Sequence, residues 1–175
     1  MAKQPRSESD MQPAPAEADT CIEDSCLPDG FVLHNTVVKK DKRGRDELCF
    51  EGMLEAGIGN PFCDCGSKTH VNNKAVIKLR HIRVSGMPSV IILKRRQYLC
   101  PKCGATRMQE IPFKKTGHLI TLALHQQVCH LLANSFATYA HIADICGIHQ
   151  LTVKNIEVER LQELSAADSG SGKTS

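Results

Sequence analysis

The sequence predicts an α+β protein in which a small β-rich domain is followed by an all-helical unit. Apolar and polar residues alternate in several runs between Phe31 and Cys100, which is the pattern of half-buried strands. From Gly117 onward the apolar residues recur at helical spacing instead. The 175-residue chain is 41% hydrophobic but only 4% aromatic, so we expect small, aliphatic cores.

Composition divides the chain into four segments. Residues 1–30 are rich in Pro, Ser, Ala and acidic residues and show almost no apolar periodicity, so we expect a disordered arm there. Residues 31–116 are expected to form the β-rich domain and residues 117–164 the helical unit. Residues 165–175 are polar and are expected to be a flexible tail.

Two hairpins account for the β-rich domain. Phe31–Val38 and Asp46–Leu54 have strand patterns and are separated by a charged turn. Ala75–Val84 alternates apolar and basic residues, and its alternation shifts phase near His81, which indicates a β-bulge. Beyond a Ser-Gly-Met-Pro turn, Ser89–Cys100 is the expected partner strand, with Lys and Arg side chains projecting to solvent.

Positive charge is concentrated on the second hairpin and its flanks. Between residues 66 and 115 there are 12 Lys and Arg residues and one acid, Glu110, so this stretch carries +11 and the rest of the chain −8. Positive charge without nearby acids repels itself unless a polyanion neutralises it. We therefore expect a nucleic-acid-binding surface. The candidate contacts on the hairpin are Lys78, Arg80, Arg83, Lys94, Arg95 and Arg96.

Two pairs of cysteines flank this hairpin. A Cys-Asp-Cys-Gly sequence precedes it and a Cys-Pro-Lys-Cys-Gly sequence follows it. Thiolates two or three positions apart on a tight turn can reach one ion, so Cys63, Cys65, Cys100 and Cys103 predict a tetrahedral zinc site. Such a site would stabilise a zinc-ribbon-like domain that is too small to hold its sheet alone. Because the spacing of the first pair is unusually short, His70 is an alternative ligand.

Other interpretations of the cysteines stay open. Cys100 and Cys103 also have the spacing of a redox dithiol, which requires a helix that begins at the first cysteine. The four thiols can also be structural residues without a metal. For Cys49 and Cys146 the simplest role is that of small buried residues.

Residues 139–159 have the pattern of a helix-turn-helix. Ala143 is small at the point where two helices would cross, and Gly147 can take the left-handed conformation that ends the first helix. An ordinary helical hairpin is the alternative. The apolar residues expected to hold the second helix against the first are Ile148, Val153 and Ile156.

The exposed start of that second helix carries side chains that can contact bases. Between residues 116 and 160 the only basic residues are Lys154 and Arg160, against three acids. The helical unit therefore cannot supply the electrostatic attraction, so we expect the hairpin to hold phosphates and the helix to read bases. The candidate DNA contacts on the helix are His149, Gln150, Lys154 and Asn155.

The order of these parts resembles the N-terminal region of the ISL-three family of insertion-sequence transposases. The resemblance covers Phe31 to about Leu164 and is strongest over 63–110 and 142–156. In that family a zinc finger and a helix-turn-helix recognise terminal inverted repeats, and an RNase H-like domain then cuts and joins DNA. The resemblance implies that the four cysteines bind zinc and that the helix starting at His149 lies in the major groove.

We therefore expect a zinc-dependent module of a transposase that binds double-stranded DNA in the cytoplasm. A second copy of the chain or a full-length transposase is a further expected partner. No apolar stretch approaches the roughly 18 residues of a membrane span, so no membrane partner is expected. Asp168 is the only acid after Glu163, so we expect no catalytic acidic triad and no enzymatic activity from this chain. The alternative function is a free-standing transcriptional regulator or an RNA-binding protein.

Overall fold

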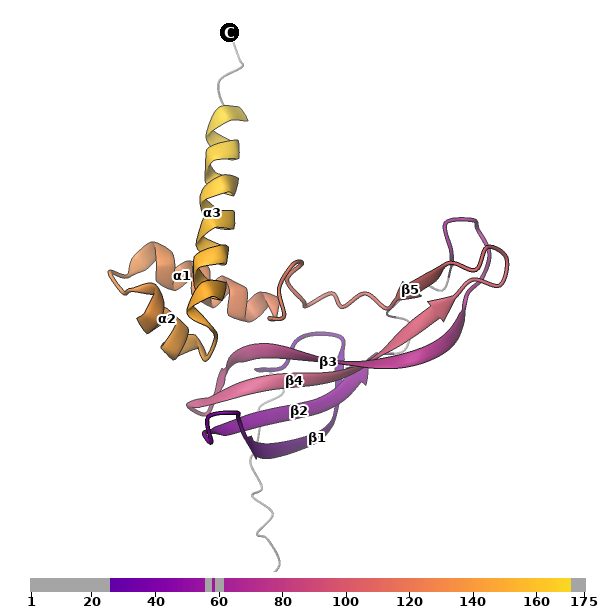
Figure 1. Cartoon of the computed structure of the whole chain (residues 1–175), viewed down its shortest axis with the longest axis horizontal. Coiled ribbons are helices and arrows are strands. Elements are labelled where there is room, and N and C mark those ends of the chain that lie inside the picture. The colour runs from indigo at the N-terminus through magenta and orange to yellow at the C-terminus, as the bar shows by residue number, and fades with distance from the viewer. Residues whose placement is uncertain (1–25, 56–57, 59–61, 171–175) are drawn as a thin grey trace, which may run out of the picture.

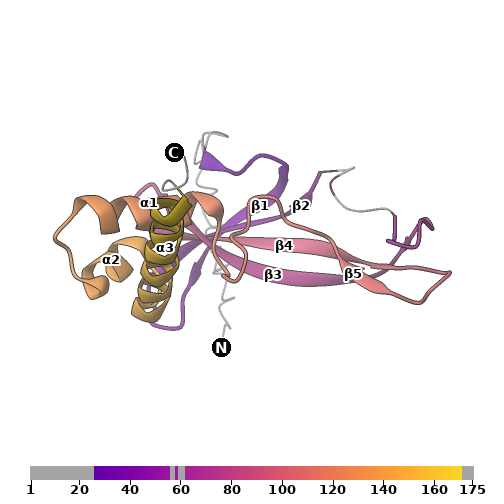
Figure 2. The same ribbon diagram turned by 90° about the horizontal axis from the view of Figure 1, so that it is seen from above.

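The computed structural model describes residues 26–55, 58 and 62–170 of the chain. Most of the predicted N-terminal arm lies outside the described residues. Figures 1 and 2 show the helices at one end of the molecule and the β3 start and β4 end at the other. The elements are β1 (Phe31–Lys40), β2 (Asp46–Leu54), β3 (His70–Val84), β4 (Met87–Leu99), β5 (Thr106–Met108), α1 (Leu122–Asn134), α2 (Tyr139–Cys146) and α3 (Gln150–Gly170).

The strands form one mixed sheet in the order β1-β2-β4-β3, with β5 paired to β4. Both predicted hairpins are present, because β1 pairs antiparallel with β2 and β3 pairs antiparallel with β4. The register of the second hairpin shifts between His81 and Val84, which confirms the predicted bulge. Between the hairpins, residues 48–53 of β2 run parallel to residues 89–94 of β4.

This arrangement corrects the predicted fold class of a zinc-ribbon-like β domain followed by a separate all-α helix-turn-helix unit. The parallel β2–β4 pairing makes the two hairpins one sheet. The segment before α1 also bonds to the edge strand, since the Arg80 N–H donates to the Leu119 carbonyl and the Thr121 N–H donates to the Arg80 carbonyl, both at 2.9 Å. Sequence alternation reveals pairing between neighbouring strands. Pairing between distant strands is indicated in the sequence only by the uninterrupted apolar run at residues 90–93, which is typical of a strand in the centre of a sheet.

The core of the sheet is more aromatic than the composition indicated. It contains three of the five phenylalanines, Phe31, Phe50 and Phe113, together with aliphatic residues such as Leu79 and Ile91. Phe31 and Phe113 meet edge to face, with ring centroids 6.2 Å apart. Phe113 belongs to the segment that follows β5, so this segment returns across the sheet before the helices begin.

The three helices share a second core. Leu124, Val128 and Ile142 are fully buried in it, as are Val153 and Ile156 from α3. The hydroxyl oxygens of Thr121 and Thr138 accept the N–H groups of Leu124 and His141, in the first turns of α1 and α2, and so cap both helices. Gly147 ends α2 with φ of 65°, the left-handed conformation that the sequence predicted at this position.

Two predicted boundaries differ from the structure. Residues 165–170 continue α3, although we expected a flexible tail from 165 onward. Cys26 and Leu27, expected to belong to the arm, pack against the sheet core instead. In the part of the chain that the structure describes, no helix is long and apolar enough to cross a membrane.

Candidate metal centre and cationic groove

The two cysteine turns lie side by side at the open end of the β3–β4 hairpin (Figure 1). The strands bring them together, because His70 at the start of β3 pairs with Leu99 at the end of β4. Each turn closes through a glycine N–H. Gly66 donates to the Cys63 carbonyl at 2.8 Å, and Gly104 donates to the Cys100 carbonyl at 3.0 Å. Both glycines have positive φ, of 78° and 72°, which explains why glycine follows each cysteine pair.

The four sulfur atoms form one cluster. The Sγ atoms of Cys63, Cys65, Cys100 and Cys103 all lie within 4.8 Å of one another. The short contacts cross between the turns, with 3.5 Å from Cys63 to Cys103 and 3.5 Å from Cys65 to Cys100. Tetrahedral zinc with Zn–S bonds of about 2.3 Å places sulfurs roughly 3.8 Å apart, so the cluster fits a zinc ion. His70, the alternative ligand, is not part of this cluster.

The shifted pKa values of Cys65 and Cys103 also fit a bound cation. The N–H and hydroxyl of Ser67, with the thiol of Cys100, lower the pKa of Cys65 to about 6. The Ala105 N–H acts to lower the pKa of Cys103, but the neighbouring Cys100 and Cys63 raise it to about 11. Adjacent thiolates repel one another, so the first proton leaves easily and the last does not. A divalent cation would remove this repulsion and allow all four thiolates to form.

The redox interpretation lacks the structural feature that it requires. Residues 101–103 form a turn, and the chain then enters β5, so no helix begins at Cys100. Cys49 and Cys146 are 1% and 3% exposed, as expected for structural thiols. Burial raises the pKa of both.

Comparison with known proteins finds one family, over the part of the chain that holds this cluster. Residues 62–103 match the ISL3 zinc ribbon, described as the zinc-finger of transposase IS204/IS1001/IS1096/IS1165. This segment resembles a transposase zinc finger. The match includes all four clustered cysteines and the hairpin between them. No curated protein and no solved structure matches the chain. The family match and the sulfur cluster together indicate a metal-binding site, for which zinc is the natural ion.

The predicted DNA contacts on the hairpin are distributed along its length. Lys78 and Arg80 both form ion pairs with Glu47, a carboxylate that is 2% exposed, and the Lys78–Glu47 distance is 2.6 Å. Arg83 lies near the hairpin turn, where its guanidinium donates to the Gly86 carbonyl at 3.4 Å. Of the three β4 cations, Lys94 is exposed, and Arg95 and Arg96 are half-buried. The sequence did not predict the Glu47 partner, because it lies 31 residues from Lys78.

The predicted contacts on the helical side lie just before α3 or in its first two turns. His149, Gln150, Lys154 and Asn155 are exposed, while Val153 on the same helix is fully buried. The imidazole Nδ1 of His149 accepts the Leu151 N–H at 3.1 Å, so His149 caps the helix as well as facing solvent.

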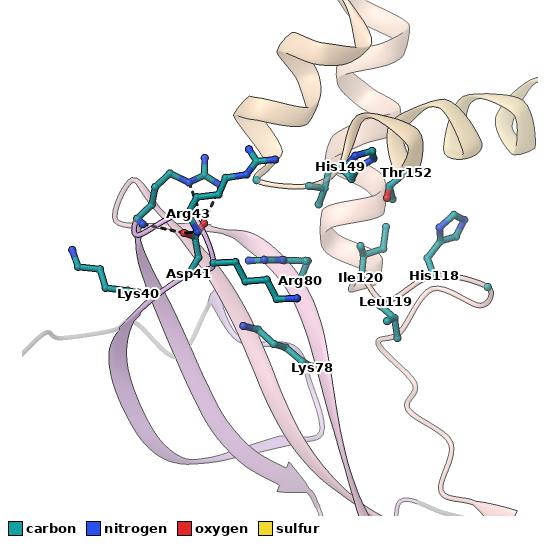
Figure 3. A pocket seen from close by; sticks show the side chains of 15 residues that line it. Lys40, Asp41, Arg43, Lys78, Arg80, His118, Leu119, Ile120, His149 and Thr152 are labelled. Carbon is teal, nitrogen blue, oxygen red and sulfur yellow. Dashed lines mark hydrogen bonds and ion pairs between the residues drawn. The ribbon is translucent and has the colours of Figure 1, made fainter.

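Sequence reasoning missed a group of cations beside these α3 residues. A cavity of about 770 Å³ lies between the sheet and the helices, and we call it the cationic groove (Figure 3). Three of its basic residues, Lys42, Arg43 and Arg45, belong to the β1–β2 turn, which the sequence showed only as a charged turn, and Lys40 ends β1 beside them. Nothing in the linear sequence indicates that this turn lies opposite α3. The groove is lined by Lys40, Asp41, Lys42, Arg43, Arg45, Lys78 and Arg80 from the sheet, and by Gly117, His118, Leu119, Ile120, Gly147, Ile148, His149 and Thr152 from the helical side.

Proposed function

We propose that this chain is a zinc-dependent, double-stranded DNA-binding module of a transposase and recognises the terminal inverted repeats of an insertion sequence. The observation that carries the proposal is the convergence of four sulfurs inside a segment that matches a transposase zinc finger. The excess of positive charge between residues 66 and 115 supports a nucleic-acid partner.

In this proposal the metal holds the open end of the β3–β4 hairpin. Cys63, Cys65, Cys100 and Cys103 would hold zinc, which supplies structural cross-links between the two turns. Among the described residues, the part of the hairpin nearest these turns gains further strand pairing only from the three-residue strand β5, because β2 covers β4 only as far as Lys94. Binding energy for the metal therefore adds to the stability of this end of the hairpin.

Base recognition is proposed for the start of α3. The exposed Gln150 and Asn155 have amides that can pair with adenine through two hydrogen bonds, and Lys154 can donate to guanine. The buried Val153 and Ile156 fix the opposite face of the helix in the helical core. A recognition role for α3 is supported by its contacts with α2 and by the three-residue turn at 147–149 that joins the two helices.

The proposal assigns recognition, and no strand cleavage, to the described residues. A full-length transposase or a second copy of the chain is the proposed protein partner, and the cytoplasm is the proposed compartment. The role of the helices in contacting bases is what separates this proposal from a zinc-containing RNA binder, in which the basic hairpin would be the whole binding surface.

The test is a fluorescence anisotropy titration of the full chain against random duplex DNA at several salt concentrations, with and without a zinc chelator. If about six cations contact phosphates, the slope of log affinity against log salt will be near −5. Chelation is expected to weaken binding strongly. Competition with structured RNA of equal length should leave the duplex bound. An absence of duplex binding, or displacement by the RNA, would contradict the proposal.

A further inference from the structure

The cationic groove has two walls that are fixed relative to each other. Backbone hydrogen bonds join residues 119–121, at the start of the helical side, to Arg80 of β3. The α2–α3 turn also packs against the start of β4, where a Cβ at Gly147 would lie 3.4 Å from Pro88 Cβ. The two walls of the groove are therefore held together by contacts within the chain.

The sheet wall is ordered by its single lining acid. The Asp41 carboxylate accepts the N–H groups of Arg43 and Arg45 at 2.7 and 3.0 Å and the Arg45 guanidinium at 3.1 Å. Hydrogen bonds from the Arg45 and Arg43 N–H groups, with the Arg45 side chain, lower the pKa of Asp41. Asp41 therefore stabilises the conformation of the β1–β2 turn that carries Lys42, Arg43 and Arg45.

Positive charge in the groove exceeds the acids that contact it. Six Lys and Arg residues line the groove, and the carboxylates within ion-pair distance of them are Asp41, Asp46 and Glu47. Lys42 and Arg43 have no carboxylate partner in the part of the chain that the structure describes. Figure 3 shows Arg43 on the sheet side, below the start of α3. An anionic ligand would find these two side chains without first displacing an internal ion pair.

The groove lies directly beside the proposed base-reading residues. A smaller cavity of about 260 Å³ adjoins it and is lined by Arg43 and Arg45 together with His149 and Gln150. If α3 lies in the major groove of a duplex, the phosphates that border that groove pass on either side of the helix. The cations of the β1–β2 turn lie where one of these two strands would pass.

We propose that the cationic groove binds the phosphate backbone of the DNA strand that borders the major groove occupied by α3. The inference rests on the proposed DNA-binding function and deepens it. It assigns phosphate contacts to the β1–β2 turn, which the sequence did not indicate, with Lys42 and Arg43 as the main contacts. The planar guanidinium of Arg43 can hold a phosphate through two parallel hydrogen bonds.

The test compares two double variants of the full chain with the wild type. Lys42→Ala/Arg43→Ala removes the two groove cations. Lys39→Ala/Arg160→Ala removes the same charge from β1 and from the later part of α3, at positions that neither line the groove nor lie between residues 66 and 115. Binding to a random 30-base-pair duplex is measured by anisotropy between about 0.1 and 0.3 M salt. Circular dichroism and zinc content verify that both variants are folded.

The groove variant is expected to bind about a hundredfold more weakly at 0.1 M salt, because each phosphate contact contributes roughly tenfold there. Its salt slope should be smaller in magnitude by about 1.8. The control variant is expected to bind within about threefold of the wild type, since its charges lie outside the contact. The loss should be the same for any duplex sequence, because phosphates carry no base identity.

The outcomes separate this inference from the function on which it rests. If the wild type binds duplex DNA and the two double variants bind alike, the groove inference is wrong while the proposed function stands. If the wild type does not bind duplex DNA, the proposed function fails first. A loss confined to one preferred sequence would also overturn the inference, because it would indicate base contacts. The inference would also be overturned if the wild type bound single-stranded DNA more tightly than duplex DNA and lost that binding in Lys42→Ala/Arg43→Ala.

Discussion

His81 and Thr121 join the edge strand of the sheet to the cap of the first helix. The imidazole Nδ1 of His81 lies 2.9 Å from the Thr121 hydroxyl, and both residues are almost fully buried. The other ring nitrogen lies 2.7 Å from the Cys26 carbonyl, which can only accept, so Nε2 carries the proton and Nδ1 accepts from Thr121. The same hydroxyl oxygen accepts the Leu124 N–H at the start of α1.

This hydrogen-bond chain predicts a pH-dependent stability. Burial lowers the pKa of His81 in the folded protein, and the Cys26 carbonyl opposes this shift only in part. Between the ordinary histidine value of about 6.5 and the lower folded value, the unfolded chain binds the proton more readily than the folded chain. The contribution of His81 to the free energy of unfolding should therefore fall as pH drops below about 6.5 and remain constant above it.

Replacing the ring tests this prediction. His81→Gln removes the titrating group and should lower stability at pH 7.5 by about 1 kcal/mol through the lost hydrogen bond. The decrease in its free energy of unfolding between pH 7.5 and 5.5 should be smaller than in the wild type. His141→Gln, at an exposed position, is the control. Urea unfolding of the three proteins gives the comparison, and an unchanged pH dependence in His81→Gln would contradict the assignment. Protonation of the metal ligands contributes equally in the wild type and both variants. The difference in pH dependence between these proteins therefore reports on His81.

Loss of one clustered thiol is expected to abolish metal binding. Cys103→Ser should reduce bound zinc from about one ion per chain to none, because tetrahedral structural sites use all four ligands. Cys129→Ser makes the same chemical change at a half-buried cysteine outside the cluster and should retain the metal. Zinc content after gel filtration gives the readout, with circular dichroism to follow the strand signal. Full zinc retention in Cys103→Ser would show that Cys103 is not a metal ligand.

Glu47 restrains two of the groove cations, so its neutralisation should affect stability and DNA binding in opposite directions. Glu47→Gln weakens the charged hydrogen bonds to Lys78 and Arg80 and should cost about 2 kcal/mol of unfolding free energy. It also makes the groove more positive, so duplex affinity should rise and the salt slope should steepen. Glu51→Gln, whose partner Lys39 lies outside the groove, is the control. Weaker DNA binding in a folded Glu47→Gln protein would contradict this prediction.

The exposed α3 residues should determine sequence preference but not stability. Asn155→Ala is expected to leave the unfolding free energy nearly unchanged, because its side chain is exposed. Its affinity for a duplex selected from a random library should fall by about 1 to 3 kcal/mol, and its affinity for random duplex should not change. Gln126→Ala, on the exposed surface of α1, controls for side-chain removal. Equal losses on both duplexes would assign Asn155 a phosphate contact instead.

Features set by short stretches of sequence were predictable. The bulge after His81 appeared as a phase shift in strand alternation, and the end of α2 as a glycine at the required spacing. Convergence of the four sulfurs followed from two short cysteine turns at the ends of one hairpin. In each case the residues that decide the geometry are near one another in the chain or are brought together by one antiparallel pairing.

Features that need distant segments to meet were not predictable. Parallel pairing of β2 with β4 joins residues about 40 positions apart, and neither strand carries a local signal of its partner. The cationic groove depends on that pairing and on the hydrogen bonds between residues 119–121 and Arg80. Arg43 therefore looked like a residue of an ordinary surface turn until the helices were placed opposite it.

The length of the β3–β4 hairpin sets a fixed spacing between the two ends of the molecule. The 13 residues of β4 span roughly 40 Å at about 3.3 Å per residue. One turn of B-form DNA measures about 34 Å, so the distance from the cysteine turns to the helices is close to one helical repeat. Contacts at the two ends would then fall on the same side of a duplex, in successive turns. Shortening the hairpin by about five residue pairs would remove roughly 17 Å, half a helical repeat, and would move these contacts to opposite sides of the duplex.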